Sequence, residues 1–379
     1  DSLDSDGEVL LDPNTFSEDG TVSMAGWYPS DDGRYLAFGK SDGGSDWRSL
    51  HVLDMESGEL LEEELKWVKF SSANWNGDGT GFYYSRYPEP DAKLQEMNKM
   101  HQVYFHTVGT PQSEDQLMYT NPDNPDEFHW MWESEDSTAH FMAHSDSTDD
   151  RNRLWWKPID AKKWIRIFDE NDAGYQLLGK KDNTVWIRTN KDAPNGRVFS
   201  MNLKKPREQT EVLAESENVL RSVGITGGRI VAQYLVDAQT KVMVHELDGS
   251  LVAEVELPGV GSASGWGGKF DQQETFYTFS SFTAPSVIYR FDMQTLESTL
   301  FRSSKVDFDP SGYIAKQVFY TSKDGTKVPM FIVHKEGIAL DGSHPTLLYG
   351  YGGFNVSLTP WFSASRVPWL EMGGVYAVA

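Results

Sequence analysis

Hydrophobic and aromatic residues alternate with small or polar residues in short runs, and polar turns separate these runs along most of the chain. A period of two is typical of β-strands, and helical periodicity is confined to one short candidate at residues 90–100. Six polar turns are each followed by an apolar strand-like run: 31–33 before 35–38, 77–79 before 82–84, 135–137 before 140–142, 181–183 before 185–187, 226–228 before 230–232 and 271–273 before 275–277.

The spacing of these turns is close to constant. Gly33 and Gly79 are 46 positions apart, and both Asn183 to Gly228 and Gly228 to Gln273 span 45 positions. Blades of a β-propeller take about 40–50 residues and four strands each, so the sequence predicts a propeller rather than a β-sandwich. Residues 5–11 are expected to supply the last turn and strand of a further blade. The expected fold is therefore an all-β, seven-bladed propeller whose first blade is incomplete.

The pattern changes after the sixth repeat. Residues 316–320 and 327–334 predict a strand pair, and 346–349 form an unbroken apolar run of the kind found in sheets covered on both faces. We therefore expect a propeller domain over residues 1–308 and the opening strands of an α/β-hydrolase domain over 309–379. The final run, residues 373–379, is predicted to be a buried strand, and its unpaired edge is expected to promote aggregation.

Charge and composition exclude several classes of function. The chain has 34 basic and 57 acidic residues, for a net charge of −23, and residues 311–379 are nearly neutral, so the acidity belongs to the propeller. Nucleic acid and anionic membranes select basic surfaces, so neither is an expected partner. No apolar run reaches the ~20 residues of a spanning helix. We interpret the acidity as a solubilising surface, with a cation or peptide site as the alternative.

The absence of cysteine excludes disulfides, thiolate metal sites and a cysteine nucleophile. A cytoplasmic location is the expectation, and a periplasmic one is compatible with the same composition. No cofactor is expected.

Three motif matches are weak because they lack the structural context that their chemistry needs. Ser41 lies in the one G-x-S-x-G match, but two strands flank it, which predicts a hairpin rather than a nucleophile elbow. His140 and His144 face one side of a predicted strand, with no acidic third ligand at a suitable spacing, so no metal site is predicted. Residues 259–265 are glycine-rich but open no helix, and predict a loop between blades rather than a dinucleotide site.

The segment 349–355 is the most informative candidate. It follows a predicted buried strand, where α/β hydrolases place a loop that supplies part of the oxyanion hole. Its three glycines would permit positive φ angles and close backbone approach to a ligand. The Tyr351 hydroxyl could donate to a developing oxyanion, and Phe354 offers a flat apolar wall suited to a proline ring. A tight turn with packed aromatic residues is the structural alternative, and the residues alone favour neither.

Residues 327–335 and 342–355 closely resemble prolyl oligopeptidases, as do 10–14 and 322–326. The resemblance extends along the whole chain. The ending Gly352, Gly353, Phe354 favours this family over oligopeptidase B, whose loop resembles Gly-Ser-Tyr at this point.

This resemblance implies a serine peptidase that cleaves short peptides after proline, through an acyl-enzyme, with a propeller that caps the catalytic domain. It implies that Tyr351 belongs to the oxyanion hole, that Phe354 lines the proline pocket and, more weakly, that Tyr83 faces the substrate from the propeller. Short proline-containing peptides are the expected partners, and the full-length protein is expected to be a monomer.

The family's nucleophilic serine, aspartate and histidine have no counterpart in this sequence. Both ends of the chain look cut, so we expect a fragment that lacks an N-terminal segment and most of the catalytic domain, and that is inactive alone. A non-catalytic propeller that binds peptides or proteins is the alternative, and a sibling peptidase for basic or acylated residues is a further one.

Overall fold

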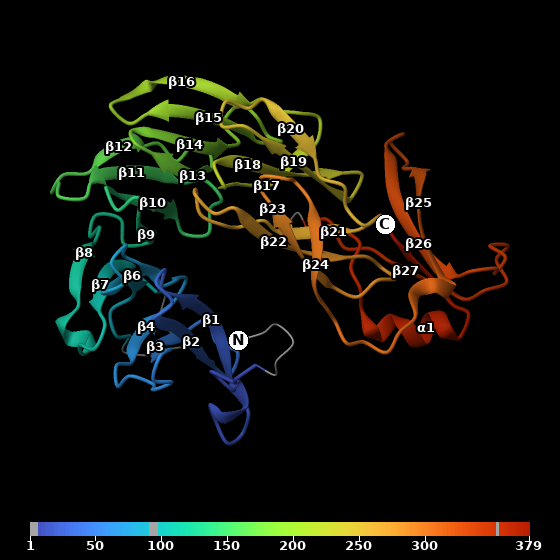
Figure 1. The fold of residues 1–379 in the computed structure, drawn as a ribbon, viewed down its shortest axis with the longest axis horizontal. Helices are drawn as coiled ribbons and strands as arrows, with labels where there is room; N and C mark the ends of the chain where they lie inside the picture. The colour runs from blue at the N-terminus through green and yellow to red at the C-terminus, as the bar shows by residue number, and fades with distance from the viewer. Residues whose placement is uncertain (1–6, 91–97, 354–355) are drawn as a thin grey trace. The chain divides into compact units, whose positions relative to one another are not determined.

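The computed structural model describes residues 7–90, 98–353 and 356–379, so most of the helix candidate at 90–100 lies outside it. The chain forms two compact units, residues 1–176 with 180–183, and residues 177–179 with 184–379. Nearly all regular structure is β-strand (Figure 1). No helix in the described part of the chain is long and apolar enough to cross a membrane.

The first unit contains antiparallel sheets that follow one another in chain order. A single strand pairing, Val68 with Arg86, joins the first two four-stranded groups into one eight-stranded sheet. The strands are β1 (Val22–Pro29), β2 (Tyr35–Asp42), β3 (Arg48–Asp54), β4 (Leu65–Val68), β5 (Asn74–Trp75), β6 (Gly81–Arg86), β7 (Gln102–Thr107), β8 (Gln116–Tyr119), β9 (Glu127–Glu133), β10 (Ala139–Asp146), β11 (Arg153–Pro158) and β12 (Ile165–Phe168). Two 3₁₀ turns accompany them, η1 (Pro13–Thr15) and η2 (Gln112–Glu114).

Three further four-stranded antiparallel sheets follow, and the residues of the first of their strands, β13, are divided between the two units. The strands are β13 (Tyr175–Lys181), β14 (Thr184–Thr189), β15 (Arg197–Asn202), β16 (Lys205–Leu213), β17 (Val219–Thr226), β18 (Arg229–Val236), β19 (Gln239–His245), β20 (Leu251–Glu254), β21 (Ser262–Gly265), β22 (Glu274–Ser280), β23 (Val287–Asp292) and β24 (Ser298–Ser303).

The predicted repeat is confirmed, because each of the six turns read from the sequence leads into the second strand of a four-stranded group: β2, β6, β10, β14, β18 or β22. The described residues contain six such blades. The strand expected for a further, incomplete blade is not formed in the part that can be described: residues 7–11 form no strand, and residues 1–6 lie outside the described residues.

Three of these turns share one hydrogen-bonding pattern. The Oδ1 atoms of Asp32, Asp78 and Asp136 accept from the backbone N–H two residues further on, at 3.0, 3.0 and 3.2 Å. Aspartate side chains stabilise tight turns in this way, which explains why an aspartate precedes the buried second strand in each case. Hydrogen bonds from the side chains of Ser30 and Thr80, together with these backbone N–H groups, hold the pKa of Asp32 and Asp78 below its usual range. Hydrogen bonds from the side chains of Lys180, Ser134 and Thr138 lower the pKa of Asp136 in spite of its partial burial.

A different sheet follows the last blade. It begins after the 3₁₀ turn η3 (Pro310–Gly312) and has the order β25-β26-β28-β27. Its strands are β25 (Tyr313–Thr321), β26 (Lys327–Lys335), β27 (Thr346–Tyr349) and β28 (Val375–Val378). β27 and β28 are parallel, and the crossover between them contains η5 (Ala364–Arg366) and the short helix α1 (Val367–Glu371). A parallel pair joined through a helix is the connectivity of an α/β sheet, as the sequence predicts.

The edge strand of this sheet is β27, whereas the sequence predicted an unpaired edge at the final run, residues 373–379. β28 is central, paired with β26 on one side and β27 on the other, and all four of its residues are buried. β27, expected to be covered on both faces, is instead exposed along its length. The cause is the crossover, which inserts the last strand between β26 and β27 and leaves β27 outermost among the described strands.

This exposed strand predicts self-association of the 379-residue polypeptide. Leu347 and Leu348 are 50% and 63% exposed, on a strand whose outer edge pairs with no other described strand. Such edges template pairing with other chains, and a lysine on an edge strand blocks it. We expect the polypeptide to form dimers and larger species as its concentration rises, and Leu348→Lys to reduce them. Light scattering after size exclusion tests this, and a concentration-independent monomer for the unchanged chain would contradict it.

A candidate active-site loop at the end of the parallel strands

The loop that contains Tyr351 begins at the carboxyl end of β27. The parallel register pairs Tyr349 with Val378, and the Ala379 N–H donates to the Tyr349 carbonyl at 3.1 Å. The carboxyl ends of β27 and β28 therefore meet at the same edge of the sheet. In α/β sheets this edge is where ligands bind, because loops and backbone groups converge there. The loop therefore begins at this edge of the sheet, and its part in an oxyanion hole stays a prediction.

Tyr351 is exposed and folds back over its own loop. Its side chain is 48% exposed, and no residue in the described part of the chain forms a hydrogen bond with its hydroxyl. A Cβ atom added at Gly353 would lie 2.8 Å from the hydroxyl oxygen, so the absence of a side chain there makes room for the ring. The phenol is thus an available donor. Phe354, the expected proline-pocket residue, lies outside the described residues.

The glycines of this loop do not act as the sequence suggests. Gly350, Gly352 and Gly353 all have φ angles outside the left-handed region, so none of them needs the positive φ that glycine permits. Around Gly350 and Gly352 nothing lies within 4 Å of an added Cβ atom. Open space on this side of the loop, rather than an unusual backbone conformation, is what these glycines provide.

The crossover after the loop is held by Arg366, which sequence reasoning missed. Its guanidinium lies 4.3 Å from the ring centroid of Trp361 and 4.9 Å from that of Tyr376, and Nη1 donates to the Trp361 carbonyl at 2.6 Å. Burial lowers the pKa of this guanidinium. Cation–π contacts of this kind favour the arginine over a lysine. Arg366 thereby ties the segment that follows the loop to the central strand β28.

The two faces of the mixed sheet differ. On one face Phe331, Tyr376 and Val378 form a buried cluster with Leu370 of α1 and Phe282 of the β22–β23 connection. The opposite face lines an open apolar groove of about 340 Å³, with Met330, Ile332, Thr346, Leu348, Val375 and Ala377 among its walls. The alternation of side chains along each strand separates the two sets.

Tyr83, the weaker candidate, is a buried residue of β6 in the first unit. It is only 5% exposed, its hydroxyl lies 2.7 Å from His140 Nε2, and its ring centroid is 4.9 Å from that of Phe105. Burial raises the pKa of the phenol. The described structure therefore gives Tyr83 a packing role and little accessible surface. Tyr351 belongs to the second unit, so the structure describes the two tyrosines separately.

The serine motif at Ser41 and the glycine-rich segment 259–265 were predicted to be a hairpin and a loop between blades. Ser41 is in β2, which forms a hairpin with β3, and its buried hydroxyl donates to the Ser45 carbonyl at 2.5 Å. It is not a nucleophile elbow. Residues 259–261 lie in the connection between β20 and β21, as expected for a loop between blades, but 262–265 form β21 itself.

The two histidines of β10 are both buried, and they have different partners. His140 lies beside Tyr83, whereas His144 Nδ1 lies 2.8 Å from His129 Nδ1 on the neighbouring strand β9. His129 and the nearby Glu127 were missed because they belong to a separate run of sequence.

Comparisons with known proteins agree with this architecture. A sequence model of the family described as "Prolyl oligopeptidase, N-terminal beta-propeller domain" matches residues 1–304. The chain belongs to the prolyl oligopeptidase family. The resemblance noted in the sequence and the propeller assignment are both confirmed, and the match ends one residue after β24.

Individual relatives in this family match the chain over nearly its whole length. A prolyl endopeptidase from Elizabethkingia meningoseptica is 39% identical over 376 residues, which are 98% of this chain and 53% of the relative. A solved prolyl endopeptidase structure has a TM-score of 0.90 at 38% identity and covers 98% of this chain and 55% of its own. Prolyl oligopeptidase B from Galerina marginata, solved with a 25-mer macrocyclization substrate, has a TM-score of 0.91 at 30% identity, with 98% and 55% coverage. The chain spans about half the length of the relatives it matches.

Proposed function

We propose that the whole protein to which this chain belongs is a serine endopeptidase that cleaves short peptides after proline. The observation that carries the proposal is membership of the prolyl oligopeptidase family together with an exposed tyrosine at the carboxyl end of the parallel strands. The relatives named above are prolyl endopeptidases, and one related oligopeptidase is solved with a peptide substrate.

In the proposed mechanism, a serine activated by a histidine attacks the carbonyl carbon of the residue before the scissile bond. The carbonyl oxygen becomes an oxyanion, the amine leaves, and water hydrolyses the acyl-enzyme. Tyr351 donates its O–H to the oxyanion, and Phe354 packs against the proline ring. Because the G-x-S-x-G match in this chain is part of a hairpin, the nucleophile and its partners belong to other residues of the whole protein.

The expected substrates are short proline-containing peptides, and the whole protein is expected to act as a monomer. The net charge of −23 makes nucleic acid an unsuitable partner.

The test compares the whole protein with the 379-residue polypeptide on two matched chromogenic peptides, one with proline and one with arginine before the leaving group. We expect the whole protein to release the chromophore after proline only, and a serine-reactive phosphonate to abolish this activity. The 379-residue polypeptide is expected to be inactive, because an oxyanion donor without a nucleophile gives little rate enhancement.

Each arm of this comparison has an outcome that contradicts the proposal. Preference for arginine would indicate a sibling peptidase, and binding of peptides without cleavage by the whole protein would indicate a binding propeller. Phosphonate-sensitive cleavage by the 379 residues alone would show that the assignment of the missing triad is wrong.

A further inference from the structure

A polar cluster is buried inside the blade formed by β9 to β12, in the first unit. Glu127, His129 and His144 are 5%, 1% and 1% exposed, and a ligand atom of each lies within 4.8 Å of those of the other two. Buried polar groups of this kind call for an explanation, because burial without full hydrogen bonding is costly. The family mechanism uses none of these three residues.

The strand register brings the three residues together. His129 of β9 and His144 of β10 are directly paired, and Glu127 is two residues from His129, so its side chain lies on the same face of the sheet. His129 Nδ1 is 2.8 Å from His144 Nδ1 and 3.9 Å from Glu127 Oε2. The acidic third group that the sequence spacing on β10 lacks is therefore supplied by the neighbouring strand.

The two imidazoles are neutral and only partly satisfied. Burial lowers the pKa of His129 to about 3 and that of His144 well below its usual value. Two neutral rings with facing Nδ1 atoms share one proton between them. His144 Nε2 is buried and has no hydrogen-bond partner among the described residues. Metal ions bind imidazole in its neutral form. Because both rings are already neutral, metal binding does not have to compete with protonation of the imidazole to imidazolium.

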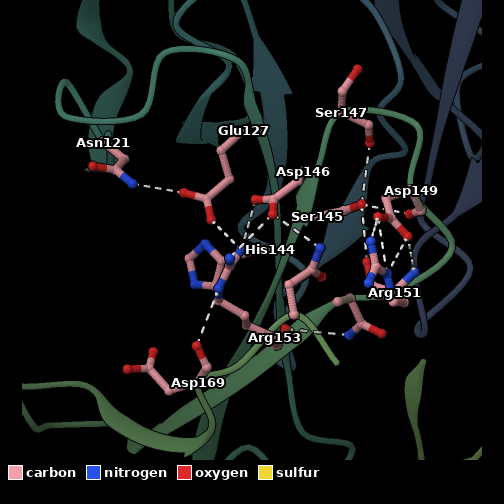
Figure 2. Close-up of polar contacts among 12 residues, drawn as sticks. Asn121, Glu127, His144, Ser145, Asp146, Ser147, Asp149, Arg151, Arg153 and Asp169 are labelled. Atoms are coloured by element: carbon pink, nitrogen blue, oxygen red, sulfur yellow. Dashed lines mark hydrogen bonds and ion pairs between the residues drawn. The ribbon is translucent and has the colours of Figure 1, made fainter. Parts of the chain in front are cut away.

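The carboxylate is oriented by neighbouring side chains (Figure 2). Arg153 Nη1 donates to Glu127 Oε1 at 2.9 Å, and Asn121 Nδ2 donates to Oε2 at 2.7 Å. The same guanidinium donates to both carboxylate oxygens of Asp146, at 2.9 and 3.2 Å. These second-sphere contacts fix the ligand in metal sites. With two carboxylates and one guanidinium, the cluster has a net charge of −1, which favours a cation.

Aromatic rings hold the histidines from the side. The Tyr119 ring centroid lies 4.9 Å from that of His129 and 5.2 Å from that of His144, and the Trp155 ring lies 4.1 Å from that of His144, tilted by 53°. Zinc bound at about 2.0–2.1 Å in tetrahedral geometry needs its two nitrogen ligands roughly 3.3 Å apart. The two Nδ1 atoms would have to separate by about half an ångström from their present 2.8 Å, and the rings would have to turn so that both Nδ1 lone pairs point at the ion and not at each other.

We propose that Glu127, His129 and His144 bind one zinc ion, which links β9 to β10 and stabilises this blade. Two imidazoles and one carboxylate are a ligand set suited to divalent transition metals rather than to calcium or magnesium. Water completes the coordination. The role is structural, because the ion is enclosed by the blade and lies on residues that the peptidase mechanism does not use.

The experiment titrates the whole protein with ZnCl₂ by calorimetry, after chelator treatment and exchange into chelator-free buffer. We expect one site and a rise in the unfolding temperature on zinc addition. CoCl₂ is expected to give visible d–d absorption bands at one equivalent. Neither readout depends on peptidase activity. Absence of stoichiometric zinc or cobalt binding by the unchanged protein would overturn the proposal without any variant.

Variants locate the site. His129→Gln and His144→Gln are each expected to weaken zinc binding by about 100-fold or more, and Asn121→Ala, which changes only a neighbour of the carboxylate, by about tenfold. His140→Gln is the matched control, because His140 is buried on the same strand but lies beside Tyr83. Unchanged zinc affinity in both ligand variants, or an equal loss in the control, would show that zinc binds elsewhere.

Discussion

Lowering the pH of the metal-free protein from 7 to 5 is expected to unfold the first compact unit, because four of its histidines are buried in their neutral form. His101, His129, His140 and His144 are all at most 5% exposed. Burial lowers the pKa of His101 and His140 to about 4 and that of His129 to about 3, and it also lowers that of His144 well below its usual value. In the unfolded chain each of them titrates near 6.5.

The direction and size of the effect follow from proton linkage. Above pH 6.5 both states are neutral and the stability is fully present. As the pH falls below 6.5, the histidines of the unfolded state become protonated while those of the folded state stay neutral. The free energy of unfolding therefore decreases until the pH reaches the pKa of the folded state. Well below pH 6.5 each histidine contributes about 1.4 kcal/mol per pH unit, so four contribute about 5.5 kcal/mol per unit. Since domains are stable by only about 5–15 kcal/mol, unfolding near pH 5 is expected.

Urea unfolding at several pH values between 5 and 7.5, with a chelator present, measures this slope. His101→Gln should reduce the slope by about 1.4 kcal/mol per pH unit, whatever its effect on stability at pH 7. The change in slope distinguishes a titrating histidine from one that merely packs. A free energy of unfolding that is flat from pH 7.5 to 5 would show that these histidines bind protons in the folded protein as readily as in the unfolded chain.

The blade pattern was predictable because it depends on local chemistry. Turn residues such as Asp32 and Asp136 form hydrogen bonds with the backbone two residues away, and the strands that follow them are buried along most of their length. Both signals act over a few residues and repeat at a constant spacing. The sequence therefore shows where each blade begins its second strand without any knowledge of long-range contacts.

The arrangement of the mixed sheet was less predictable, because strand order is a long-range property. The apolar runs of β27 and β28 look alike in sequence, yet the crossover places β28 in the centre and β27 at the edge. Helix α1 was not predicted, since it has only five residues and begins with a proline in its first turn. The burial of either strand is decided by its neighbours rather than by its own residues.

The buried histidine cluster was predictable in part, less so than the blades and more so than the order of the mixed sheet. The turn at residues 134–138 fixes the register of β9 against β10, and that register places position 129 opposite position 144. Hairpin geometry applied to the sequence would thus have paired the two histidines. What no sequence rule supplies is the depth of burial and the role of Arg153, which comes from a third strand.

In the whole protein, Tyr351→Phe is expected to lower kcat by 100- to 1,000-fold with little change in KM. An oxyanion donor acts only once negative charge has developed, and loss of one such donor costs about 2.7–4 kcal/mol of transition-state stabilisation. The exposed Tyr351 hydroxyl forms no hydrogen bond within the described residues, so its removal should leave folding intact. Steady-state kinetics on the proline peptide, with unfolding temperatures for both proteins, provide the measurement.

Tyr349→Phe is the control for this substitution, because Tyr349 is the last residue of β27 and is similarly exposed, at 46%. Both changes remove one phenolic oxygen from the same short segment. If the two variants lose activity equally, the loss reflects disturbance of the segment and not an oxyanion contact. If Tyr351→Phe raises KM while kcat is retained, the hydroxyl binds the peptide in its ground state, because an interaction confined to the transition state changes kcat. Only a selective fall in kcat at Tyr351 supports its assignment to the oxyanion hole.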